Sequence, residues 1–120
     1  MDKVELEKRT KRFALRIIAF VATFPRTKAA SVIEYQLVKC GTSIGANYRE
    51  ANRAESRADF IHKVAIAEKE ASETCYWLEV CDEAPIGDRT QLIWLLQESR
   101  ELLAIFTSIG RSTKANSARI

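Results

Sequence analysis

Apolar residues recur along this chain at alternating steps of three and four positions, the spacing that keeps one side of a helix against a partner. The pattern predicts a helix over about residues 4–24 and three more that begin after Thr27, Ser56 and Asp88 and run to about residues 53, 82 and 110. The clearest run follows Ser56, and its seam is Phe60, Val64, Ala67, Ala71, Thr74, Leu78 and Cys81.

The sequence also predicts where these helices end. Pro25 ends the first helix, because the residue before a proline is pushed out of the helical region. Residues 84–88 combine Pro85, Gly87 and a good N-cap in Asp88. Long helices joined by short turns predict an all-α fold, an antiparallel up-down-up-down four-helix bundle over residues 1–110, followed by a polar and frayed C-terminal tail at 111–120.

Two glycines and an asparagine interrupt the second helix. Gly41 and Gly45 each cost up to about 1 kcal/mol relative to alanine in a helix interior, so they predict either a close approach by another helix or a bend. Asn47 falls where the seam expects an apolar residue. We interpret it as part of a structural polar network that fixes helix register, more plausibly than as chemistry. The members of this predicted network are Ser43, Asn47, Glu50, Glu70 and Glu73.

Size and composition fit a single helical domain, with 120 residues, 47% hydrophobic and 29% charged. The charged N-terminus and the absence of a long apolar run predict a cytoplasmic protein without a membrane span. Cys40, Cys75 and Cys81 are scattered along predicted helices, so we interpret them as small core residues in a reducing compartment.

Catalytic and metal-binding patterns are poorly supported. His62 is the single histidine, and Asp59-x-x-His62 gives one imperfect copy of a motif that a di-iron bundle needs twice. A nucleophile triad has no cleft, and no Gly-rich loop lies between a strand and a helix. We expect a protein that is not an enzyme and has no metal and no cofactor.

Charge placement is more informative than the net charge of +3. The predicted topology gathers the start of the first helix, the turn between the second and third, and the end of the fourth at one pole. A set of arginines there forms the candidate nucleic-acid-binding site: Arg9, Arg12, Arg49, Arg53 and Arg57. The alternative is a solvated helix surface whose arginines only keep the protein soluble.

The third and fourth helices are apolar on more than one stripe. One set is Ile61, Ile66, Trp77 and Val80, and the other is Trp94, Leu95, Leu102 and Ile109. A single seam cannot bury all of these, so the surplus predicts a homo-oligomer. The alternative is a wide core that absorbs them within one chain.

Matches over most of the chain carry a resemblance to a known family. They are Phe24-Pro25, Gln36-Leu37, Thr42-Ser43-Ile44-Gly45-Ala46-Asn47, Glu50, Asp59-Phe60, Ala67, Glu70-Ala71, Glu73-Thr74 and Trp77-Leu78. At these positions the chain resembles the small bacterial four-helix-bundle proteins encoded in intervening sequences of 23S ribosomal RNA genes.

The resemblance implies an antiparallel bundle, a ring-like homopentamer and no established enzymatic activity. A similar bundle is the accessory protein of diversity-generating retroelements, where a basic pentameric barrel works with a reverse transcriptase and nucleic acid. Two functional hypotheses follow: an oligomer that associates with RNA or DNA through its basic pole, and a structural or adaptor module that receives another protein.

Overall fold

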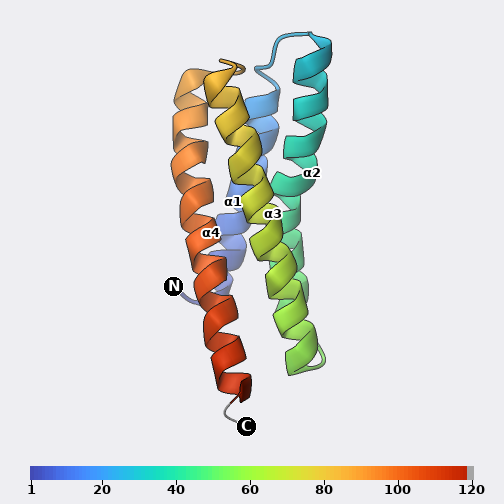
Figure 1. Cartoon of the computed structure of the whole chain (residues 1–120), viewed down its shortest axis with the longest axis vertical. Coiled ribbons are helices and arrows are strands. Elements are labelled where there is room, and N and C mark those ends of the chain that lie inside the picture. Colours follow the sequence, from blue (N-terminus) through green and yellow to red (C-terminus); the bar gives the residue numbers. More distant parts are fainter. Residues whose placement is uncertain (119–120) are drawn as a thin grey trace.

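The computed structural model describes residues 1–118, and the side chains of residues 1–116. Four helices make up the described chain: α1 (Lys3–Val21), α2 (Lys28–Ala51), α3 (Arg57–Glu83) and α4 (Arg89–Ala118). Figure 1 shows them side by side and alternating in direction, with α1 and α3 each packed between α2 and α4. The prediction of an all-α, up-down-up-down bundle is confirmed.

Short polar residues begin the helices as the sequence predicts. The side chains of Thr27, Ser56 and Asp88 accept hydrogen bonds from the backbone N–H groups three residues later. Asp2 does the same for α1, where Glu5 reaches back to the backbone N–H of Asp2 and completes a capping box. Each cap satisfies an N–H that the helix itself leaves without a partner.

Two predicted helix ends are wrong. The first helix ends at Val21 rather than Phe24, since the N–H groups of Thr23 and Phe24 turn back to carbonyls three residues earlier. The fourth helix does not stop at Gly110 but continues to Ala118, so residues 111–118 are helical rather than frayed. Gly110 lacks the positive φ that would end a helix there, whereas Gly87, in the turn before α4, has a φ of 87°. Residues 119 and 120 of the predicted tail lie outside the described part.

The predicted close approach of helices occurs at both glycines of α2. A Cβ on Gly41 would lie 2.9 Å from Cγ1 of Ile17, and one on Gly45 would lie 2.9 Å from Oγ1 of Thr10. Both contacts are with α1. Glycine at these two positions therefore lets the backbones of α1 and α2 pack closely.

The core is wider than the sequence pattern suggested. Leu95 and Leu102, expected as surplus, are completely buried, and Trp77 and Trp94 are half-buried against the core. Val80 and Ile109 also pack on the core, and Ile61 and Ile66 are half-buried. The core of one chain therefore absorbs Leu95 and Leu102, whereas the other six stay partly exposed. The large apolar side chains that stay exposed are others. They are Met1, which precedes α1, and Val4, Leu15, Ile18, Val32, Tyr35, Tyr76 and Ile93, which lie on the four helices.

Candidate nucleic-acid interface

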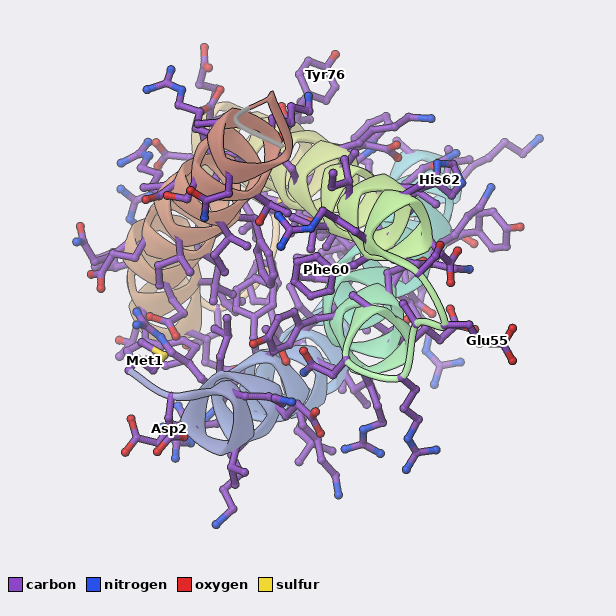
Figure 2. All side chains as sticks on the ribbon, turned by 90° about the horizontal axis from the view of Figure 1, so that it is seen from below. Met1, Asp2, Glu55, Phe60, His62 and Tyr76 are labelled. Atoms are coloured by element: carbon purple, nitrogen blue, oxygen red, sulfur yellow. The ribbon has the colours of Figure 1, made fainter. Side chains whose placement is uncertain are left out.

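Cations gather at one end of the bundle. The start of α1, the α2–α3 turn and the end of α4 all lie toward this end (Figure 1). Figure 2 looks along the bundle from the same end and shows Phe60 between the helices, with Glu55 pointing outward at the turn. The exposed cations on these segments are Lys3, Lys8, Lys11, Arg12, Arg49, Arg53, Arg57, Arg111 and Lys114.

Arg9 is the exception among the five candidate arginines. Its Nε lies 2.7 Å from one oxygen of Glu98, its Nη2 lies 2.7 Å from the other, and Nη2 also donates to Glu101 at 2.8 Å. The side chain is only 20% exposed. The hydrogen bond to Glu98 is the largest influence that raises the pKa of Arg9. These bonds join α1 to α4 and occupy the Arg9 guanidinium, so Arg9 is not positioned to bind a phosphate.

A groove between α1 and α2 holds two of the remaining candidates. It has a volume of about 480 Å³ and is lined by Glu7, Thr10, Lys11, Ala14, Thr42, Gly45, Ala46, Arg49, Glu50 and Arg53. Several of its lining residues are small, among them Ala14, Gly45 and Ala46. Lys11, which the candidate set did not include, completes the cationic lining; it lies one turn after Glu7 and faces α2, a position that only the packing of α1 on α2 reveals.

The carboxylates of this groove are engaged with cations. Glu7 lies 3.5 Å from Nε of Arg49 and accepts a hydrogen bond from Asn52 at 2.8 Å, while Glu50 lies 3.5 Å from Nζ of Lys63. Within the described side chains, Lys11 and Arg53 form no ion pair closer than 4.0 Å. They are therefore the groove cations that are available to an anion.

The other two candidate arginines lie outside this groove. Arg12 is exposed on α1, and Arg57 is exposed at the first position of α3, beside the Ser56 cap. Arg57 lines a separate hollow with Phe60 and Thr113, between the α2–α3 turn and the end of α4. The structure thus brings Arg49 and Arg53 together with Lys11, and places Arg12 and Arg57 at the same end without joining them to the groove.

In the described chain, no side chain of the predicted polar network bonds to the side chain of another member: Glu50 pairs with Lys63 of α3, and the other side-chain bonds of the set are within single helices. The amide of Asn47 donates to the carbonyl of Ser43 at 2.9 Å, and the hydroxyl of Ser43 donates to the carbonyl of Lys39. Glu73 accepts a hydrogen bond from the indole of Trp77. Glu50 is exposed and the other four members, Glu70 among them, are half-buried. A role of this set in fixing register or assembly stays a prediction.

Thiols and the histidine show no reactive arrangement. Burial raises the pKa of Cys40 and of Cys81 to about 11 and also raises the pKa of Cys75. Thiols in this state are poor nucleophiles at neutral pH. His62 is exposed and points outward in Figure 2. Among the described residues, no three His, Cys, Asp or Glu side chains are grouped to hold a metal, and none of the described helices is long and apolar enough to cross a membrane.

Comparison with known proteins places this bundle among relatives. Residues 2–108 match the family model described as 23S rRNA-intervening sequence protein. A crystal structure of a protein of unknown function from the S23 ribosomal protein family of Bacteroides thetaiotaomicron is similar, with a TM-score of 0.82 and 38% identity over 92% of this chain and 99% of that one. No curated protein matches.

Proposed function

The chain belongs to the 23S rRNA-intervening sequence protein family, and from its basic groove we propose a non-enzymatic function: it is a cytoplasmic homo-oligomer that binds nucleic acid. The observation that carries this proposal is the groove between α1 and α2, lined by Lys11, Arg49 and Arg53. Its cations lie at one end of the bundle with several more around them. Phosphate contacts of this kind are the sequence-independent part of nucleic-acid binding.

Assembly would strengthen a weak site. The family resemblance implies five copies, and a ring that places several such grooves on one surface multiplies a modest phosphate attraction. Aromatic side chains are scarce around the groove, since none is among its lining residues. Stacking on unpaired bases is therefore not the favoured mode, and the proposal is for backbone contacts to structured RNA or duplex DNA.

Charge reversal tests this site against an equivalent arginine at the other end. Arg53→Glu is compared with Arg26→Glu, an exposed position in the α1–α2 turn. We measure fluorescence anisotropy of labelled hairpin RNA and duplex DNA at low and moderate salt. We expect Arg53→Glu to weaken binding to both probes and to reduce the salt slope by about 1, and Arg26→Glu to leave both unchanged. Absence of salt-sensitive binding by the native protein, or equal effects of the two variants, would contradict the proposal.

A second candidate, an adaptor that receives another protein, draws on the exposed apolar side chains. Leu15, Ile18 and Tyr35 are each at least half exposed on α1 and α2, and exposed apolar groups on one surface are typical of protein contacts. Affinity capture from lysate with and without nuclease separates the two functions. A partner protein retained after nuclease treatment supports the adaptor, whereas partners lost with nuclease support the nucleic-acid function.

A further inference from the structure

Two stripes of exposed residues run along α1 and α2 on the same side of the bundle. Within each stripe the residues recur at steps of three, four or seven, which keeps them on one face of a helix. Lys11 of the first stripe and Ala46 and Arg49 of the second line the same groove, so the stripes adjoin. We call them together the α1–α2 face: Val4, Lys8, Lys11, Leu15 and Ile18 on α1, and Lys28, Val32, Tyr35, Lys39, Ala46 and Arg49 on α2.

The α1–α2 face holds most of the large apolar side chains that the described chain leaves exposed. Only Met1, Tyr76 and Ile93 lie elsewhere. The five on the α1–α2 face are each at least half exposed. Apolar side chains gathered on one side in this way mark a surface that binds something.

The charges of the α1–α2 face are all positive. Among the described side chains, Lys8, Lys11, Lys28 and Lys39 have no carboxylate within 4.0 Å. The acidic residues of α1 and α2 lie beside the two stripes and not on them: Glu5 is in the capping box with Asp2, Glu7 is paired with Arg49, Glu50 is paired with Lys63 of α3, and Glu34 lines a hollow at the α1–α2 turn with Arg26.

We propose that the α1–α2 face binds the surface of a membrane that contains anionic phospholipid. The lysines contact the head groups, and Leu15, Ile18 and Tyr35 enter the boundary between head groups and acyl chains. Apolar side chains combined with lysine and arginine on one side are typical of helices that lie on a membrane without crossing it. Lysine suits this position because its stem lies along apolar surface while its ammonium group stays at the head groups. This inference goes beyond nucleic-acid binding, which uses only the groove at one end of the face.

Other occupants match the α1–α2 face less well. The phosphates of a nucleic acid would leave the aliphatic Leu15 and Ile18 in water. A second copy offers no outward stripe of carboxylates alone, because α3 exposes Lys69 as well as Glu79, and α4 exposes Arg100. The cations are spread along α1, whose 19 residues extend about 28 Å, and along α2. A lipid surface presents negative charge over such a length without any alignment of individual carboxylates.

Vesicle binding by two double variants tests the proposal. We measure co-sedimentation with vesicles of phosphatidylglycerol and phosphatidylcholine in equal amounts, and with vesicles of phosphatidylcholine alone. We expect the native protein to bind only the anionic vesicles, and to bind them more weakly as salt is raised. Leu15→Ser with Ile18→Ser should weaken this binding by about tenfold or more, because apolar contact with the lipid is lost. Tyr76→Ser with Ile93→Ser is the control on α3 and α4, where Tyr76 points away from the bundle (Figure 2), and it should bind like the native protein.

Charge reversal separates lipid binding from nucleic-acid binding. Lys39 is exposed on the α1–α2 face but is not among the residues of the groove, and Lys69 is exposed on α3. Lys39→Glu should weaken binding to the anionic vesicles by about fivefold or more and leave the affinity for hairpin RNA unchanged. Lys69→Glu should change neither. All the substituted side chains are exposed, so circular dichroism should report native helix content for every variant.

Each contrary outcome is specific. A native protein that does not sediment with anionic vesicles at low salt overturns the proposal, whatever its affinity for RNA. Equal vesicle binding by the native protein and by Leu15→Ser with Ile18→Ser overturns the entry of these side chains into the lipid. If that double variant instead turns a native oligomer into single chains, or loses a protein captured from a membrane-free lysate, while neither form binds vesicles, then a second copy or a partner protein covers the face and the proposal is wrong.

Discussion

At the scale of single residues, the two glycines of α2 let α1 pack closely, although glycine is unfavourable in a helix interior. A Cβ at Gly45 would lie 2.9 Å from Oγ1 and 3.3 Å from the backbone carbon of Thr10. Thr10 is completely buried and its hydroxyl already donates to the carbonyl of Leu6 at 2.9 Å. Neither the backbone nor this hydroxyl can move aside cheaply, so the contact sets the spacing of α1 and α2.

Gly45→Ala is therefore expected to destabilise the protein, although alanine is the better helix former. Overpacking costs about 1–3 kcal/mol, more than the gain of up to about 1 kcal/mol in propensity. Gly110→Ala is the matched control, because the nearest atom to its Cβ would be 3.9 Å away, and it should stabilise the protein. Urea unfolding monitored by circular dichroism measures both. If both substitutions stabilise the protein alike, the close approach does not constrain Gly45.

The buried thiol of Cys81 gives a dependence of stability on pH. Burial raises its pKa to about 11 in the folded chain, above roughly 8.5 in an unfolded chain. The folded state therefore holds the proton more tightly, and this contribution is fully present below about pH 8.5 and is lost as pH rises toward 11. Between pH 8 and pH 10 the free energy of unfolding should fall less in Cys81→Ala than in the native protein. Parallel losses in urea titrations would assign the effect to other groups.

At this scale the sequence predicts contacts between residues that are close along the chain, but not contacts between residues that are far apart along it. The caps at Thr27, Ser56 and Asp88 were predictable because each bonds to a group three residues away. The role of Arg9 was not, since its partner Glu98 is 89 residues away. A basic stretch in one helix does not say which arginine faces a carboxylate of another. For the same reason the groove could be anticipated through Arg49 and Arg53 but not through Lys11.

At the scale of elements, α1 and α4 form the lightest contact of the bundle, and two arginines bridge it. Arg9 binds Glu98 and Glu101, and the guanidinium of Arg16 lies 4.8 Å from the ring centroid of Trp94. The sequence predicted these helices as elements from their apolar spacing. It could not predict which pairs of helices make the most extensive contact, because the extent of contact depends on which side chains come together after packing. The sequence also placed the end of α4 wrongly, at Gly110. A glycine ends a helix only where its backbone adopts a positive φ, and Gly110 does not.

Replacing Arg9 with lysine should weaken this interface despite the conserved charge. One ammonium cannot reproduce the two parallel hydrogen bonds that the guanidinium donates to Glu98, a carboxylate only 13% exposed. We expect Arg9→Lys to lower the free energy of unfolding by about 1–2 kcal/mol. Arg89→Lys, in the exposed pair with Asp82, should change it by less than about 0.5 kcal/mol. Chemical unfolding of both variants measures the difference, and equal small effects would mean that the Arg9 bonds contribute little.

At the scale of the whole molecule, the bundle is unevenly packed. α3 lies in extensive contact with both α2 and α4, whereas α1 packs well on α2 alone. The most deeply packed helix also contains a continuous buried seam, from Val64 through Ala71 to Leu78. Opening α1 therefore breaks fewer interactions than opening α3, and the resulting state keeps a three-helix core.

Hydrogen exchange should reveal this order of opening. Amides in the middle of α1, near Phe13, should exchange with a lower opening free energy than those of α3 near Ala71, because local unfolding follows contact density. Arg9→Lys should increase exchange in α1 and leave α3 at the limit set by global unfolding, since the lost bonds join only α1 to α4. Arg89→Lys, whose pair lies at the α3–α4 turn, should leave α1 unchanged. Equal protection of α1 and α3, in the native protein and in Arg9→Lys, would mean that the bundle opens as a single cooperative unit in which the α1–α4 contact is as strong as the others.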